Sequence, residues 1–224
     1  MYHYAGNNPL NFVDPDGRIF CPLMVFDKQN NASNSSLPMG ASPSGIFNEN
    51  NELIKQNTIG AYGCLFVSTM NVGNSVIFNS IGPKKVKDYS ASDRYFHYTQ
   101  PRKKGEDGWT ETDALMSPPQ MKNLLSDLTG HRYSILSYSG KEYVSSMVKI
   151  FQKAKERVYG IVEVKTTYGS HFINLYWNND TKKLSYFDPY VWNNDEIKNS
   201  IDQQIKDRTF RLIIIREKGD EIVK

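Results

Sequence analysis

Three residues that are far apart in the sequence, Cys64, His171 and Asp188, have the types and the order that nucleophilic acyl transfer requires. Cys64 follows a turn of small residues that ends at Gly63, and the apolar run after it has room for about two helical turns. We therefore expect the thiol at a helix N-terminus, where partial positive charge favours thiolate and lowers a cysteine pKa. Such a nucleophile needs a base and a group that orients the base.

The proposed base and its partner lie in a region with the alternating pattern of paired β-strands. Alternation places His171, Ile173 and Leu175 on one face of their strand. In a hairpin, Asp188 can approach the imidazole from the end of the next strand and leave the other ring nitrogen for Cys64. The predicted strands cover residues 160–165, 171–177 and 183–187, joined by a turn at 168–170 and a hairpin loop at 178–181.

Each residue of the set also has an ordinary structural interpretation. Most free cysteines are small buried hydrophobic residues, a histidine at a strand start is commonly just packed, and Asp-Pro commonly opens a turn. The order and spacing of Cys64, His171 and Asp188 together favour the catalytic interpretation. We expect Cys21, in an apolar patch, to be structural, and without a Cys-x-x-Cys motif or clustered histidines we expect no metal and no cofactor.

Over residues 54–190, this arrangement resembles papain-like cysteine peptidases, and it is most similar to the bacterial branch that trims leader peptides from exported bacteriocins. The resemblance implies an α+β fold, with an N-terminal helical part that carries the cysteine and a C-terminal antiparallel sheet that carries His and Asp. It also implies an oxyanion hole formed by the backbone amide of the cysteine and an upstream glutamine side chain. Gln56 is the candidate for that side chain, and Asn57 is its substitute. The chain departs from the family in having Cys64-Leu-Phe in place of Cys-Gly-Pro.

The remaining segments supply the scaffold. Residues 82–116 are predicted to be rich in loops, and Trp109 is a candidate substrate-binding residue there, with a cap on the core as the alternative. Ser117 begins a predicted amphipathic helix that ends at Gly130. Further segments predict a helix opening at residues 139–142, a helix capped by Asn193, and a final buried strand that ends at Arg216.

The N-terminal segment carries a second specific pattern, Tyr-x-Tyr-x-x-Asn-Asn-Pro-x-x-x-x-Asp-Pro-x-Gly, over residues 2–17. It resembles the motif that ends the core of rearrangement-hotspot (Rhs) and YD-repeat proteins. In that family a variable C-terminal domain, usually a toxin, follows the motif. The resemblance therefore implies a polymorphic toxin with a cognate immunity protein, secreted or delivered into a target cell. Arg18 stands where the family usually has leucine.

The predicted domain organisation has three parts. Residues 1–22 are the end of the repeat-associated core, residues 23–45 are a flexible linker because they are small, polar and without apolar periodicity, and residues 46–224 are the effector domain. The 224 residues suffice for one sizeable core, and 39% of them are hydrophobic. We see neither a membrane span nor a signal peptide. The net charge of +3 is too small to indicate a nucleic-acid partner.

The sequence thus predicts a soluble, cysteine-dependent acyl-transfer enzyme that acts on a protein or peptide. Peptide hydrolysis is the first expectation, and glutamine deamidation or transamidation uses the same thioester intermediate. Two alternatives stay open. One is a catalytically inactive papain-like binding module, and the other is a nuclease effector, which calls for a metal site and a basic face.

Overall fold

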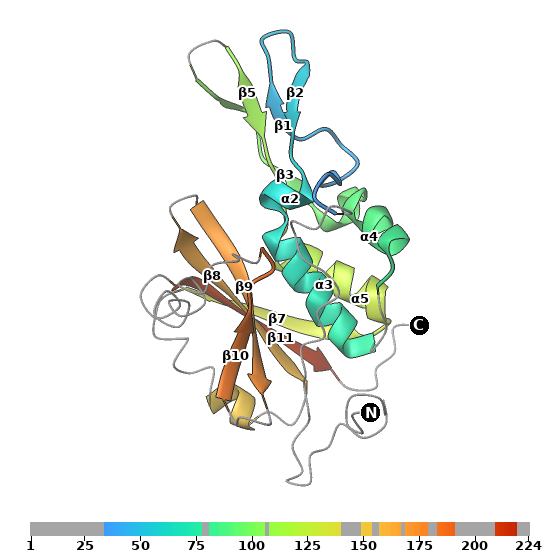
Figure 1. Cartoon of the computed structure of the whole chain (residues 1–224), viewed down its shortest axis with the longest axis vertical. Helices are drawn as coiled ribbons and strands as arrows, with labels where there is room; N and C mark the ends of the chain where they lie inside the picture. The colour runs from blue at the N-terminus through green and yellow to red at the C-terminus, as the bar shows by residue number, and fades with distance from the viewer. Residues whose placement is uncertain are drawn as a thin grey trace.

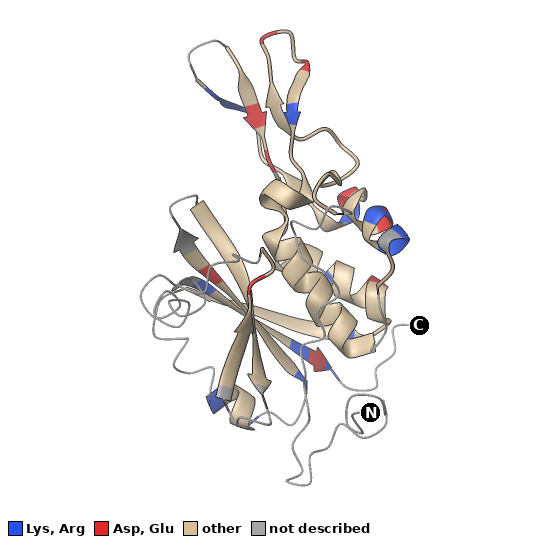
Figure 2. Cartoon of the chain, in the orientation of Figure 1, with Lys and Arg blue, Asp and Glu red and all other residues tan. Residues whose placement is uncertain are grey.

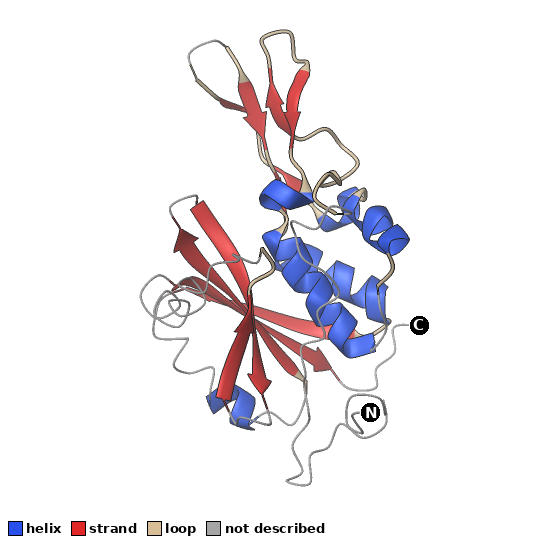
Figure 3. Ribbon diagram, viewed as in Figure 1, coloured by secondary structure: helices blue, strands red, loops and turns tan. Residues whose placement is uncertain are grey.

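The described part of the chain forms an α+β fold in which the main helical layer covers one face of an antiparallel sheet (Figures 1 and 3). The computed structural model describes residues 34–77, 81–105, 108–139, 149–153, 157–166, 169–178, 183–190 and 209–218. The repeat-protein motif, Cys21 and the predicted Asn193 helix lie outside these residues. Within them, no helix has the length and apolar character needed to cross a bilayer.

The main sheet carries the histidine of the predicted site. Its strands run in the order β10-β9-β8-β11-β7, and every neighbouring pair is antiparallel. The strands predicted at the C-terminal end of the chain are confirmed; β10 has the predicted bounds, and the other three are slightly longer. The strands are β7 (Arg132–Ser139), β8 (Val158–Thr166), β9 (Gly169–Asn178), β10 (Lys183–Phe187) and β11 (Thr209–Lys218).

Strand β11 explains why the sheet can be covered on both faces. Leu212 and Ile214 belong to one buried cluster together with Phe151, whereas Ile213 and Ile215 belong to a second cluster together with the helices. Because successive side chains of a strand point to opposite faces, a continuous apolar run fits a strand that is buried on both sides. Residues 149–153, which are helical, therefore pack on the face opposite the main helices.

Two helices form the layer that holds the predicted nucleophile. Helix α3 (Cys64–Ile77) packs against α5 (Pro118–Thr129) and β9. The prediction of α5 is confirmed, and Gly130 ends it with φ of 76°. The capping detail differs, because Ser117 contacts the side chain of Gln120 and no side-chain cap bond to the helix backbone forms. With 14 residues, α3 is also longer than the predicted two turns.

The segment predicted to be rich in loops contains regular structure. Its helices are α4 (Pro83–Ser90) and the 3₁₀ turn η1 (Asp93–Tyr95), and its strands are β3 (His97–Tyr98), β4 (Arg102–Lys103), β5 (Thr110–Thr112) and β6 (Ala114–Leu115). Strands β4 and β5 join β1 (Gly45–Phe47) and β2 (Leu53–Gln56) in a small sheet of order β2-β1-β5-β4. This small sheet projects from the helical layer (Figure 1). Its strands are too short for a clear alternating pattern in the sequence.

Residues 34–44 are packed against the domain, although their composition predicts a linker that extends to residue 45. The backbone of Leu37 accepts a hydrogen bond from Ile59 at 2.9 Å, and Met39 is 3% exposed. Asp93 accepts hydrogen bonds from the backbone amides of Ala41 and Ser42 at 2.7 and 2.9 Å. Small polar residues thus form turns here whose backbone groups are satisfied by the folded domain. The packed domain therefore begins before residue 46.

Candidate functional site

Cys64 is the first residue of α3, as the sequence predicts, and its entry angle is set by Gly63. A short helix α2 (Ile59–Tyr62) precedes it, and the amide of Gly63 donates to the carbonyl of Ile59 at 2.8 Å. A Cβ atom at Gly63 would lie 2.6 Å from that carbonyl oxygen and 2.7 Å from the Ile59 Cα. Only glycine permits this close passage between the two helices, so the turn of small residues fixes where the thiol sits.

His171 and Asp188 are in direct contact. The imidazole Nε2 lies 2.7 Å from Asp188 Oδ1, and both side chains are nearly buried. The same oxygen accepts the backbone amide of Tyr190 at 2.8 Å, which is the pattern of an Asx turn. The Tyr190 ring stands edge-on to the imidazole with centroids 6.4 Å apart. The Asp-Pro-Tyr sequence therefore holds the carboxylate in a fixed position beside the histidine.

The environment of His171 favours its protonated form. Burial alone lowers a histidine pKa, but the hydrogen bonds that His171 makes with Asp188 and with Cys64, and the negative charges of both partners, raise the pKa of His171 to about 10. Because Nε2 contacts Asp188, Nδ1 is the ring nitrogen that remains for Cys64. An imidazolium donates from both nitrogens, so it can bridge a thiolate and a carboxylate.

A buried polar contact locks the helix of Cys64 onto the strand of His171. Asn174 of β9 is fully buried, and its amide nitrogen donates to the Ser68 carbonyl of α3 at 2.9 Å. Its amide oxygen accepts the side chain of Asn71 at 3.2 Å. Unpaired amides cost stability in a dry interface, so only one register of helix against strand satisfies these groups. The contact thereby fixes the distance between the thiol and the imidazole.

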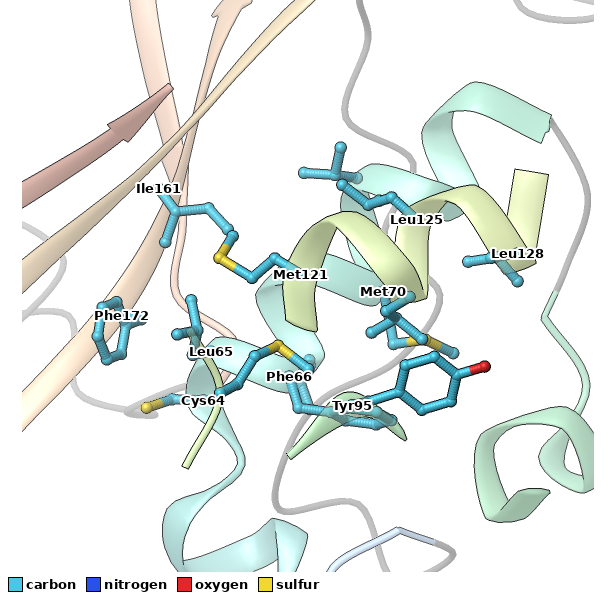
Figure 4. Close-up of a cluster of buried hydrophobic side chains, with 14 of the residues drawn as sticks. Cys64, Leu65, Phe66, Met70, Tyr95, Met121, Leu125, Leu128, Ile161 and Phe172 are labelled. Atoms are coloured by element: carbon cyan, nitrogen blue, oxygen red, sulfur yellow. The ribbon is translucent and has the colours of Figure 1, made fainter. Parts of the chain in front are cut away.

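Cys64 and His171 both line a pocket of about 940 Å³. Figure 4 shows Cys64 at the end of a cluster of buried side chains, with Leu65 beside it and Phe172 on the side of the sheet. Tyr62, Leu115 and Tyr190 are exposed by 43%, 42% and 37% and also line the pocket. The thiol thus faces a largely apolar pocket with large hydrophobic side chains at its rim.

Three further predicted residues lie elsewhere. Gln56 is exposed at the end of β2, where it pairs with Gly45 in the small sheet. Asn57 is buried and its amide nitrogen lies 3.4 Å from Asp113 Oδ1. Trp109 is 39% exposed in the loop between β4 and β5. None of the three lines the pocket, and no asparagine or glutamine does so among the described residues. The structure therefore places the predicted oxyanion side chains, Gln56 and Asn57, outside the described lining of the pocket.

Sequence reasoning missed two charged residues of the pocket, Glu163 and Arg211. They stand on adjacent strands, and their side chains approach to 2.9 Å. The sequence places both in otherwise apolar strands, which is the only signal that could have identified them. Among the residues that the structure describes, no three His, Cys, Asp or Glu side chains gather as a set of metal ligands.

Comparison with known proteins includes a distant structural likeness. No protein-family model matches the sequence, and no curated protein matches it significantly. Among solved structures, UfSP from C. elegans is similar with a TM-score of 0.37 and 10% sequence identity. The similarity covers 87% of this chain and 37% of that protein.

Proposed function

We propose that the chain is a papain-like cysteine-dependent acyl-transfer enzyme, with peptide hydrolysis as its first reaction. The observation that carries this proposal is the continuous contact from Asp188 through His171 to Cys64 at the wall of a pocket. A cysteine, a base and a group that orients the base form the minimum set for covalent catalysis by a thiol. The sequence order and the helix-plus-sheet layout support the papain-like assignment.

The mechanism follows from the contacts of His171. The Cys64 thiolate attacks the substrate carbonyl carbon, forming a C–S bond and a tetrahedral oxyanion. Collapse of this intermediate breaks the C–N bond, and the imidazolium proton passes to the leaving amine. Water then attacks the thioester and gives a proton to neutral His171, the C–S bond breaks, the acid is released, and the Cys64 thiolate and the imidazolium are regenerated. Asp188 holds the ring throughout by accepting a hydrogen bond from Nε2–H.

The leaving group and the acceptor decide which reaction of this class takes place. An amine released from a peptide bond gives proteolysis, and ammonia released from a glutamine side chain gives deamidation. An amine that attacks the thioester in place of water gives transamidation. All three reactions require the same Cys64 and His171.

We further propose that this enzyme is the effector domain of an Rhs-type toxin. The support is the core-end motif at residues 2–17. The proposal includes a protein target in a recipient cell and an immunity protein in the producer. Expression of the chain in a bacterial cytoplasm is then expected to stop growth, whereas Cys64→Ala of equal abundance is expected to be harmless.

Alkylation of the thiols tests the chemistry without knowledge of the substrate. A limiting amount of iodoacetamide is applied from about pH 4 to about pH 9, and the mass of each cysteine-containing peptide is measured. We expect Cys64 to react selectively well below the ordinary thiol pKa of about 8.5, and we expect His171→Ala to abolish this selectivity. Cys21 is the internal control. Equal, slow modification of both cysteines would refute the enzyme proposal and favour an inactive binding module.

The nuclease alternative has a separate outcome. Lysines and arginines of the described chain are spread over α4, the small sheet and the ends of the large sheet (Figure 2). Nucleic-acid binding draws on basic side chains that are grouped on one face. Degradation of DNA or RNA by the Cys64→Ala variant would favour the nuclease alternative over the thiol enzyme.

A further inference from the structure

We propose that Arg211 is a specificity residue of this pocket and binds an acidic side chain of the substrate, with Glu163 and Phe172 holding it in place. This inference rests on the proposed thiol chemistry and adds a substrate class to it.

Arg211 is built into the sheet at the wall of the pocket. Arg211 pairs across strands with Glu163, and Glu163 pairs with Phe172 on the other side. The guanidinium lies 5.4 Å from the centroid of the Phe172 ring, and its Nε lies 2.9 Å from Glu163 Oε2. Phe172 directly follows His171 in β9, so two cross-strand pairs, through Glu163 of β8, connect Arg211 to the neighbour of His171. All three residues line the pocket.

The two charges differ in their access to the pocket. The Glu163 side chain is 7% exposed, whereas the Arg211 side chain is 34% exposed. Buried carboxylates need a partner, so Glu163 acts as the internal counter-ion that keeps the guanidinium in one position. A substrate in the pocket therefore meets the cation and not the anion. Among the described residues that line the pocket, Glu163 and Arg211 are the only Asp, Glu, Lys or Arg side chains.

The guanidinium retains donors that suit a carboxylate. An arginine has N–H donors on three nitrogens in a rigid fork, and Glu163 approaches its Nε side to 2.9 Å as an ion pair without hydrogen-bond geometry. The ring of Phe172 takes one face of the guanidinium plane. The terminal nitrogens fit a bidentate contact with Asp or Glu, which is the strong, directional pairing of this group. The apolar surroundings at Leu65 and Phe66 strengthen such a contact because they exclude water.

A matched set of covalent probes tests this assignment. The probes are acyl-dipeptide chloromethyl ketones that differ only in one residue, which is Glu, Gln, Leu or Lys. The rate at which each alkylates Cys64 in the full chain is measured by mass spectrometry. We expect the Glu probe to react at least about tenfold faster than the Lys probe, because only the Glu probe can make a charge-assisted hydrogen bond with Arg211.

The variants are chosen so that no buried charge is left unpaired. In the double variant Glu163→Gln/Arg211→Met we expect the preference for Glu to fall to within about twofold of that for Leu, since the charge contact is gone. Arg211→Lys keeps the charge and is expected to retain part of the preference, because an ammonium binds carboxylates without the fork. Iodoacetamide, which is neutral and small, gives the basal rate of Cys64 alkylation in each protein, and the rate of every probe is divided by it.

The outcomes separate this proposal from the proposed function. Equal rates for the Glu and Lys probes, or a preference for Glu that the double variant retains, would overturn the role of Arg211. If iodoacetamide shows an activated Cys64 in the same samples, only the specificity proposal fails. If iodoacetamide shows no activated Cys64 but the Glu probe still reacts faster than the Lys probe, the proposed enzyme function fails. The proposal that Arg211 binds an acidic side chain then stands.

Discussion

At the scale of single residues, the site depends on how one carboxylate oxygen is shared. Asp188 Oδ1 accepts hydrogen bonds from both the imidazole of His171 and the backbone amide of Tyr190. The backbone amide can only donate, so the atom at this position must be an acceptor. The turn therefore presents an acceptor oxygen to His171. As a consequence, it favours the form of the ring that carries a proton on Nε2.

This arrangement predicts a difference between two substitutions of Asp188. In Asp188→Asn the Tyr190 amide orients the side chain with its oxygen toward His171, so the ring stays in place, and we expect the rate of Cys64 alkylation to fall by about tenfold or less. In Asp188→Ala the ring loses its acceptor, and we expect a loss on the order of a hundredfold. The measurement is iodoacetamide labelling at neutral pH. Equal losses in the two variants would contradict the selection by the turn.

The raised pKa of His171 predicts how stability depends on pH. A folded-state pKa of about 10, above the unfolded value of 6.5, means that the folded protein binds the proton more tightly. The stabilisation is fully present below about pH 6.5 and is lost as pH rises toward about 10. We expect the difference in unfolding free energy between wild type and His171→Gln to shrink over this interval, as measured by urea denaturation. A difference that stays constant from pH 6.5 to 10 would show that Asp188 and Cys64 do not hold the proton.

The identities of the three contacting residues could be predicted from the sequence because residue type and order carry that information. Cys64 begins an apolar run, and His171 and Asp188 flank a hairpin with a clear alternating pattern. The oxyanion side chains could not be predicted, because Gln56 lies close to Cys64 in sequence but on a strand that belongs to another sheet. When a short helix lies between two residues, their closeness in the sequence does not predict whether their side chains point toward the same site.

At the scale of elements, long periodic segments were predictable and short or irregular ones were not. Helix α5 and strands β8 to β11 have the periodicity of one or two buried faces, and they lie where the pattern places them. Strand β7 was missed because its apolar residues are interrupted by serines, and its pairing with β11 supplies what its own pattern lacks. Tertiary pairing of this kind overrides local propensity.

The junction between α2 and α3 gives a prediction at this scale. Gly63→Ala introduces a methyl group 2.6 Å from the Ile59 carbonyl oxygen, so the helices must move apart and shift Cys64. We expect a loss of about 1–3 kcal/mol in unfolding free energy, and a slower reaction of Cys64 with iodoacetamide. Gly82→Ala is the matched control because no atom lies within 4 Å of its added Cβ. The idea fails if the two variants unfold and react alike.

At the scale of the whole molecule, the site lies where two layers meet and is fastened by segments that are distant in the chain. The thiol comes from the helical layer and the imidazole from the sheet, and Asn174 ties them together across their interface. Residues 34–44 also hold the site in place, because they form backbone hydrogen bonds with the segment that leads into α2. The position of Cys64 thus depends on residues that the composition alone assigns to a linker.

The last prediction concerns where the domain begins. A chain that starts at Asn34 keeps the hydrogen bonds from the amides of Ile59 and Gly60 to the carbonyls of Leu37 and Ser35, at 2.9 and 3.0 Å. A chain that starts at Ile46 loses them and uncovers Ile59, which is fully buried. We expect the shorter chain to be less stable by about 2–4 kcal/mol in urea denaturation, because it leaves buried amides unpaired and removes apolar cover.

The thiol reports on the same truncation independently of stability. If residues 34–44 hold α2 in place, Cys64 of the shorter chain should lose its selective reaction with iodoacetamide under conditions in which that chain is still folded. Asp93→Ala in the longer chain is the matched control. It releases the amides of Ala41 and Ser42 and the hydroxyls of Ser42 and Tyr98 but leaves the contacts of Leu37 and Ser35 in place, so we expect it to have the smaller effect. Equal stability and equal reactivity of the two chains would place the domain boundary at residue 46, as composition predicts. A loss confined to the shorter chain would make residues 34–44 part of the catalytic domain.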